Sequence, residues 1–215
     1  MNVMLTRVLT VVAALAVLSS LSGCVPVAAV GMGVGMASLN DRRTSGAQIE
    51  DEAIELRVNN RVSGRWGEKA HINITSYNRS VLLTGEVPDA SAREQAEQMA
   101  AGVANVRSVT NELTVGAPSQ LSNRSNDAFI TSKIKARFVE AEKFNPLHVK
   151  VVTEAGTAYL LGIVTQAEAD QATEIARTTA GVRRVVRIFE FCKLTDDVCR
   201  PPPPVRGDPP KSTAQ

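Results

Sequence analysis

Three cysteines and two histidines carry much of the reactive chemistry in this 215-residue sequence. Cys192 and Cys199 stand close together near the C-terminus, a spacing that suits a small-loop disulfide in an oxidising compartment. The spacing alone does not establish the bond, because the geometry of the fold decides whether two cysteines can pair. No histidine or further cysteine lies near this pair in the sequence, so it does not indicate a metal site.

His71 and His148 stand at equivalent points of an internal repeat, each just before an expected strand. Two isolated histidines in separate domains cannot share a metal ion or a proton, so we expect both to be structural. No Ser/His/Asp or Cys/His arrangement is visible, and the acidic residues are expected on helix surfaces. The sequence therefore predicts no catalytic residue, no metal site, no cofactor and no enzymatic activity.

Cys24 offers a different chemistry, the covalent attachment of lipid. Arg7 gives the N-terminus a positive charge, residues 8–18 form a short apolar run, and small residues lead to Leu-Ser-Gly-Cys at 21–24. The apolar run is shorter than the roughly 20 residues of a membrane-spanning helix. We therefore predict a signal peptide at 1–23.

The Leu-Ser-Gly-Cys segment resembles the bacterial lipobox, which implies that Cys24 is lipidated and becomes the first residue of the mature chain. Several acyl chains make such an anchor effectively permanent. Val25 follows, rather than the Asp that marks inner-membrane retention in enterobacterial lipoproteins. We expect a lipid anchor in the outer membrane, with the protein facing the periplasm. The alternative is an uncleaved, buried helix that ends in an incidental cysteine.

The composition excludes several classes of protein. Lys and Arg number 24 against 22 Asp and Glu, which is too balanced for binding nucleic acid by charge. Only 4% of the residues are aromatic, which argues against base stacking. We expect no nucleic-acid partner.

Between residues 48 and 193 the chain contains two copies of one pattern. In each copy an amphipathic helix precedes two β-like runs, a second helix and a last strand. The first copy (residues 48–115) is expected to place these elements at 50–63, 72–77, 81–87, 89–101 and 106–115. The second copy (residues 125–193) is expected to place them at 127–141, 149–153, 158–164, 166–180 and 185–193.

The pattern of each copy predicts an α-β-β-α-β unit of the α+β class, with two helices packed on a small three-stranded sheet. Because a domain this small buries only a modest core, we expect the two copies to pack on each other. We expect the lipidated cysteine and a flexible tether at 24–47 and a linker at 116–124. Residues 194–215 are expected to be a Pro-rich tail without a fold.

This arrangement resembles tandem BON domains and, with the lipobox, the dual-BON outer-membrane lipoproteins. In the first copy the resemblance rests on Ile54, Val58, the segment Leu-Leu-Thr-Gly-Glu-Val at 82–87, Val106, Val109 and Asn111. In the second copy it rests on Ile130, Ile134, the segment Leu-Leu-Gly-Ile-Val at 160–164, Gly181, Val182 and Val185. Asn105 departs from the usual glycine, and asparagine tolerates the left-handed conformation fairly well. The cysteine pair and the Pro-rich tail are additional to the pattern.

The resemblance implies binding of anionic phospholipid and maintenance of the outer-membrane barrier, without catalysis. It also implies that the opening helix of the second copy meets the lipid through an aromatic residue in the segment 125–130, here Phe129. At 100° per residue, Ile130, Ile134 and Phe138 face the core. The candidate lipid-binding residues lie off that face: Phe129, Ser132, Lys133, Ala136 and Val139. An exposed aromatic ring near a lysine suits insertion between anionic headgroups.

The first copy lacks the aromatic residue and the positive charge that binding to anionic lipid requires. Ala53 stands at the position of Phe129, and acidic residues crowd the first helix (Glu50, Asp51, Glu52 and Glu55). Residues 48–115 carry seven basic and ten acidic side chains, whereas 127–193 carry ten basic and eight acidic ones. We therefore expect only the second copy to approach an anionic membrane.

Three alternatives remain open at this stage. Phe129 could instead fill the contact between the two copies. Arg183, Arg184 and Arg187 form either a solvated strand edge or a contact with headgroups. The protein could also be a periplasmic adaptor for outer-membrane assembly proteins, with the Pro-rich tail as its binding segment.

Overall fold

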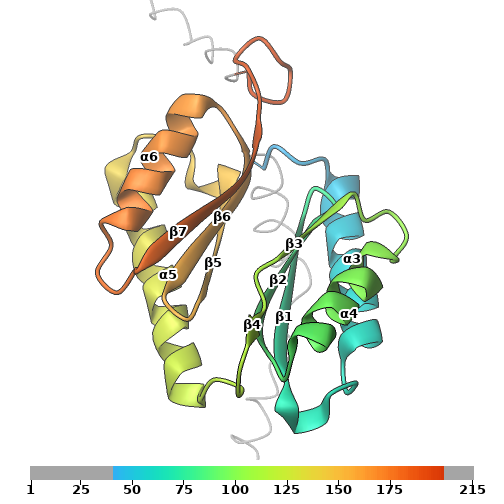
Figure 1. The fold of residues 1–215 in the computed structure, drawn as a ribbon. Helices are drawn as coiled ribbons and strands as arrows, with labels where there is room; N and C mark the ends of the chain where they lie inside the picture. The colour runs from blue at the N-terminus through green and yellow to red at the C-terminus, as the bar shows by residue number, and fades with distance from the viewer. Residues whose placement is uncertain (1–40, 201–215) are drawn as a thin grey trace, which may run out of the picture. The chain divides into compact units, whose positions relative to one another are not determined.

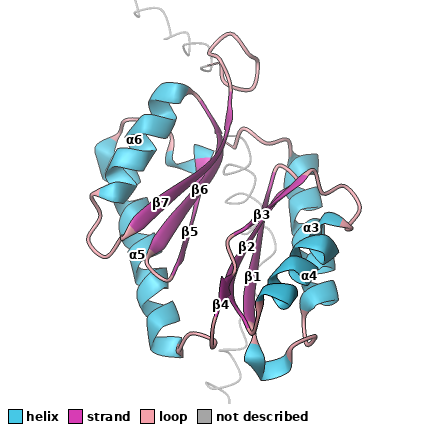
Figure 2. Ribbon diagram, viewed as in Figure 1, coloured by secondary structure: helices cyan, strands magenta, loops and turns pink. Residues whose placement is uncertain are grey.

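A computed structural model of the protein describes residues 41–200 and contains two successive α-β-β-α-β units (Figure 1). The expected α+β class, with helices on one side of each small sheet, is confirmed (Figure 2). The predicted signal peptide, the lipidation of Cys24 and most of the tether lie outside the described residues, as does the tail beyond residue 200.

The first copy follows the expected order of elements. Its helices are α3 (Ser45–Val62) and α4 (Ala90–Ala101), and its strands are β1 (His71–Tyr77), β2 (Ser80–Val87), β3 (Ser108–Asn111) and β4 (Thr114–Val115). A short 3-10 helix, Gly67–Lys69, precedes β1. Strand β2 pairs antiparallel with β1 and parallel with both β3 and β4.

One expected strand of the first copy is interrupted. The alternation at 106–115 predicts a single strand, but the structure divides it into β3 and β4. At the break the Leu113 N–H donates to the side-chain oxygen of Asn111 (3.2 Å), and Leu113 is buried in the core. The asparagine side chain therefore competes with the strand ladder for a backbone donor.

The second copy contains helices α5 (Leu121–Ala141) and α6 (Gln166–Arg177) and strands β5 (Val149–Glu154), β6 (Thr157–Val164) and β7 (Arg184–Phe191). A 3-10 helix, Pro146–His148, precedes β5. Strand β6 pairs antiparallel with β5 and parallel with β7. Helix α6 ends at Arg177, before the expected residue 180, and the Thr179 N–H donates to Ala176 O, three residues back instead of four.

Each copy has its own apolar core between its helices and its sheet. The opening helices bury the residues that their four-residue spacing predicts: Ile54, Val58 and Val62 in α3, and Ile130, Ile134 and Phe138 in α5. Asn105 adopts a left-handed backbone with φ of 69°, and its counterpart Gly181 has φ of 101°. The tolerance expected of asparagine at this turn is therefore seen in the fold.

A third apolar cluster joins the two copies. It contains Tyr77 and Leu82 of the first copy and Tyr159 and Leu161 of the second. These side chains come from strands whose other residues face the helices, so each sheet has a second buried face. The two copies pack on each other as expected, and their sheets form the contact.

Arg42 and Arg43 bind different copies. Arg42 donates to Ile163 O (3.0 Å) and forms an ion pair with Glu168 (2.6 Å) in the second copy. Arg43 forms an ion pair with Asp51 (2.8 Å) in the first copy, and its guanidinium lies 4.2 Å from the ring centroid of Tyr77. Two adjacent residues therefore connect the start of the described chain to both copies.

Candidate functional site

The outer face of α5 exposes the aromatic residue that the sequence singles out. Phe129 and Val139 are each 62% exposed, and Ser132 and Ala136 are also exposed. The helix turns these side chains outward because Ile130, Ile134 and Phe138 occupy the core. The alternative in which Phe129 fills the contact between the copies is wrong, because the sheets make that contact.

Lys133 lies beside Phe129 on this face. Its ammonium is 4.8 Å from the ring centroid and also donates to Ala180 O (2.6 Å) at the turn after α6. A cation over an aromatic face is attracted by the ring's electron density. The second copy therefore holds a positive charge next to an exposed ring, within one turn of helix.

Helix α5 begins at Leu121, earlier than the expected Asp127, and this extension enlarges the exposed face. Leu121 is 73% exposed and precedes Ser125 and Phe129 at four-residue intervals. We call the following residues the α5 stripe: Leu121, Ser125, Phe129, Ser132, Ala136 and Val139. The four-residue spacing from Leu121 was available in the sequence as a signal for this longer helix.

Charged side chains border the α5 stripe on both sides. Lys133 and Lys135 contribute positive charge, whereas Glu140 is exposed near the C-terminal end of the helix. The stripe therefore combines apolar and small polar side chains with basic neighbours. Its exposed large apolar side chains are Leu121, Phe129 and Val139.

The opening helix of the first copy is less acidic on its surface than the sequence predicts. Asp51 is only 2% exposed, so its expected place on the helix surface is wrong. Glu50 pairs with Arg57 (2.6 Å) and Glu55 pairs with Lys150 (3.0 Å). Helix α3 also exposes two aliphatic residues, Ile49 (68%) and Leu56 (61%), which makes it a useful comparison for α5.

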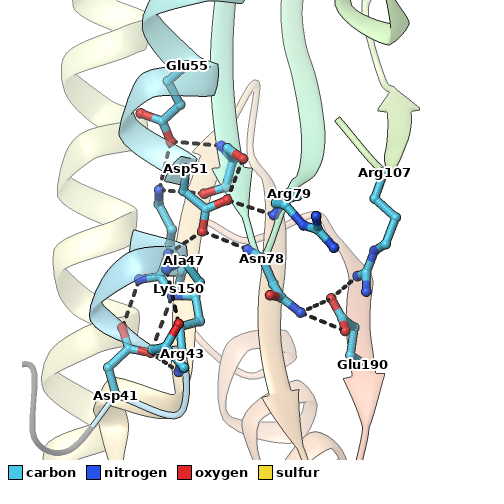
Figure 3. Close-up of polar contacts among 12 residues, drawn as sticks. Asp41, Arg43, Ala47, Asp51, Glu55, Asn78, Arg79, Arg107, Lys150 and Glu190 are labelled. Atoms are coloured by element: carbon cyan, nitrogen blue, oxygen red, sulfur yellow. Dashed lines mark hydrogen bonds and ion pairs between the residues drawn. The ribbon is translucent and has the colours of Figure 1, made fainter. Parts of the chain in front are cut away.

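Asp51 is buried because it holds the turn between β1 and β2 (Figure 3). Its carboxylate accepts hydrogen bonds from the backbone N–H groups of Asn78 and Arg79 (both 2.7 Å) and from the Ser76 hydroxyl (2.7 Å). Both turn residues have positive φ, of 50° and 65°. The carboxylate thereby satisfies two backbone N–H groups that point away from the sheet because the turn is left-handed.

Asp127 performs the same role in the second copy. It accepts hydrogen bonds from the backbone N–H groups of Ala155 and Gly156, each at 2.9 Å, and is 6% exposed. The signal for this role was present in the sequence, since an aspartate recurs at the same position of both opening helices. It was missed because acidic residues were assigned to helix surfaces as a class.

The two histidines lie apart, each beside a glutamate of its surroundings. His71 Nδ1 is 3.4 Å from Glu86, and His148 Nδ1 is 3.3 Å from Glu168. Burial and the nearby Arg42 lower the pKa of His148. Burial opposes ionisation of Glu168, but hydrogen bonds from Arg42 and Thr165 lower its pKa to about 2. His148 therefore borders an ion pair, which fits the structural role expected of it.

The arginine cluster near β7 is exposed but not free. Arg184 pairs with Glu112 of the first copy (2.6 Å), Arg187 lies 3.5 Å from Asp170, and Arg183 donates to Ala155 O. These side chains thus have protein partners as well as contact with solvent.

Cys192 and Cys199 are joined in a disulfide in the structure, with 6.2 Å between their Cα atoms. This separation lies within the usual range for disulfides. The bond closes a loop after β7 in which Cys199 is buried and Leu194 and Val198 are exposed.

Within residues 41–200, no helix is both long enough and apolar enough to cross a bilayer. The fold defines a protein built from two repeated α-β-β-α-β domains, and the family model for the BON domain matches residues 50–117 and 126–192. The chain therefore belongs to the BON domain family and carries two such domains.

Curated relatives match most of this chain. It is 37% identical over 173 residues to the outer membrane lipoprotein DolP of Haemophilus influenzae, covering 80% of this chain and 90% of that protein. It is also 37% identical over 153 residues to the 21 kDa hemolysin of Actinobacillus pleuropneumoniae, covering 70% and 79%. Identity to the osmotically-inducible protein Y of Escherichia coli K12 is 31% over 141 residues, covering 64% and 70%.

Proposed function

We propose that this chain is an outer-membrane lipoprotein, anchored at Cys24, that binds anionic phospholipid through the α5 stripe and supports the barrier of the cell envelope. The similarity to the outer membrane lipoprotein DolP supports the location. The observation that carries the lipid site is the exposed Phe129 ring with the Lys133 ammonium beside it. The protein acts as a binding module rather than an enzyme.

The physical basis is insertion of apolar side chains together with attraction to headgroups. Burying a phenylalanine side chain contributes about 1.5–3 kcal/mol. A lysine near an anionic surface adds about 1 kcal/mol. These amounts suit reversible contact by a domain that a lipid anchor already keeps at the membrane.

The test uses residues 24–215 with Cys24→Ser, so that no acyl chain contributes to binding. Co-sedimentation is measured with phosphatidylcholine vesicles that contain or lack phosphatidylglycerol. Phe129→Glu is expected to weaken binding to the anionic vesicles at least tenfold, since about 1.4 kcal/mol corresponds to a factor of ten.

Leu56→Glu is the matched control, because Leu56 has nearly the same exposure but lies on α3 (61% against 62%). It is expected to leave binding unchanged. Equal binding by wild type and Phe129→Glu contradicts the proposed site, and equal loss in both variants assigns lipid contact to the whole surface.

A second candidate function is that of an adaptor for outer-membrane assembly proteins. An exposed apolar group favours it, formed by Phe191 (59%), Leu194 (61%) and Val198 (42%) around the disulfide loop. Deleting residues 200–215 removes the tail, and co-purification from envelopes then tests whether the tail is the binding segment. A partner that binds the tail is expected to be lost, whereas lipid binding is expected to survive, so the experiment separates the two functions.

A further inference from the structure

Three side chains that could bind a metal ion converge where the two sheets meet. His71 begins β1 and Glu86 stands directly opposite it on β2, whereas Glu154 ends β5 of the second copy. One ligand atom from each lies within 4.8 Å of the other two. Glu86 and Glu154 are only 8% and 7% exposed. The cluster thus draws ligands from both copies.

The negative charge of this cluster is poorly neutralised by protein groups. Glu154 accepts hydrogen bonds from Asn73 (2.6 Å) and Thr84 (3.4 Å), and Glu86 accepts one from the Ser119 N–H (3.1 Å). Among the ion pairs of residues 41–200, none joins Lys or Arg to either glutamate. A buried carboxylate without a cation is costly.

Two arginines lie near the cluster, but both are committed to carbonyl groups. Arg124 donates to Ser119 O (2.8 and 3.2 Å), and Arg183 donates to Ala155 O (2.7 Å). Asp127, which also lies nearby, is occupied by the β5–β6 turn. Burial raises the pKa of Glu154; the hydrogen bond from Asn73 and the charge of His71 oppose this effect, and the charges of Glu86 and Asp127 add to it. Neither arginine therefore forms an ion pair with Glu86 or Glu154.

His71 adds a second observation to this cluster. Its Nδ1 atom is buried and has no hydrogen-bond partner. Nδ1 lies 3.4 Å from a Glu86 oxygen. Two ligands at about 2.0–2.1 Å from a tetrahedral zinc ion are separated by about 3.3 Å. The pair therefore already has the spacing of two ligands of one ion.

The second copy provides a natural contrast. His148 corresponds to His71, but Ile163 stands in the place of Glu86, and Arg42 neutralises the neighbouring Glu168. Only the first histidine therefore faces two carboxylates without a basic partner. A cavity of about 410 Å³ lined by His71, Asn73, Arg124 and Glu154 provides a route of entry from solvent.

We propose that His71, Glu86 and Glu154 bind one Zn²⁺ ion, which ties the first copy to the second. Imidazole nitrogen and carboxylate oxygen are both ligands that zinc takes, and three protein ligands leave the fourth tetrahedral position for water. Ca²⁺ and Mg²⁺ instead take six or more oxygen ligands, or keep much of their water. The sequence led us to expect no metal, because two histidines in separate domains cannot share one ion; that reasoning left out carboxylates as partners of His71.

Isothermal titration of zinc sulfate into EDTA-treated chain (residues 24–215, Cys24→Ser) at neutral pH tests the proposal. One equivalent is expected to bind with a Kd of about 10 μM or tighter. His71→Ala and Glu154→Gln are each expected to weaken binding at least tenfold, a loss that removing even a supporting group commonly produces. His148→Ala is the matched control and is expected to bind as wild type.

Circular dichroism of each variant checks that it is folded, and Glu154→Gln gives the test if His71→Ala is not. Cobalt provides a second readout, since tetrahedral Co²⁺ absorbs visible light strongly and is expected to lose that absorption in the same variants. The proposal is overturned if wild type binds no zinc at about 100 μM. It is also overturned if His148→Ala weakens binding as much as His71→Ala does, or if calcium binds as tightly as zinc.

Discussion

Replacing Asp51 with asparagine isolates the contribution of one carboxylate to the fold of the first copy. The change preserves size but exchanges one oxygen for an N–H₂ group, which cannot accept a hydrogen bond. In the structure each oxygen accepts two: Oδ1 from Ser76 Oγ and the Arg79 N–H, and Oδ2 from the Asn78 N–H and Arg43. Either orientation of the amide therefore loses two bonds and sets a donor against a donor.

A hydrogen bond to a charged group contributes about 1.5–3 kcal/mol. Asp51→Asn is therefore expected to lower the free energy of unfolding of the first copy by at least about 3 kcal/mol. Asp127→Asn is the comparison for this loss of stability, because each oxygen of Asp127 accepts only one hydrogen bond from the turn. Its expected cost in the second copy is about half as large.

Urea unfolding followed by tryptophan fluorescence measures the first effect. Trp66 is the only tryptophan in the chain, and it packs against the core of the first copy. Circular dichroism, which follows both copies together, measures the unfolding of the Asp127→Asn protein. Glu52→Gln is the control, since Glu52 is exposed on the same helix and its replacement is expected to change stability by less than about 0.5 kcal/mol. The reasoning is refuted if Asp51→Asn costs less than about 1 kcal/mol, or less than Asp127→Asn.

Two further predictions concern the second copy. Ala155 has φ of 47° in the turn, so Ala155→Gly is expected to relieve strain and stabilise the protein by up to about 1 kcal/mol, measured by urea unfolding; a loss of stability contradicts this. Because the pKa of Glu168 falls from 4.5 to about 2, its ion pair with Arg42 stabilises the fold fully above pH 5 and is lost as the pH falls towards 2. Between pH 6 and pH 3, wild type is expected to lose about 1–2 kcal/mol more stability than Glu168→Gln, and equal losses would show that the pair contributes nothing.

The repeated pattern was enough to predict the fold of each copy. Ile54 and Val58 have the spacing of a buried helix face, and Ile130 and Ile134 repeat it, so local periodicity identified both cores. Phe129 was also placed correctly on the outer face of its helix, since its angle from the core residues follows from helical geometry alone.

The features that the sequence did not reveal depend on contacts between distant segments. Asp51 is buried only because the β1–β2 turn folds over it. Glu86 and Glu154 are buried only because a second sheet covers the first, and strand alternation describes one buried face at a time. Both opening helices begin earlier than expected, α3 at Ser45 and α5 at Leu121, because the expected boundaries were set by the buried apolar residues, which start later in each helix.

The adjacent residues Arg42 and Arg43 give the fold a mechanical property. A force that pulls on the chain from its N-terminal side acts on both copies, because Arg42 is bound to the second copy and Arg43 to the first. Helix α3, which begins at Ser45, is thereby shielded from being pulled open one turn at a time. A chain pulled from its N-terminal side therefore loads ion pairs to both copies before it loads the first turn of α3.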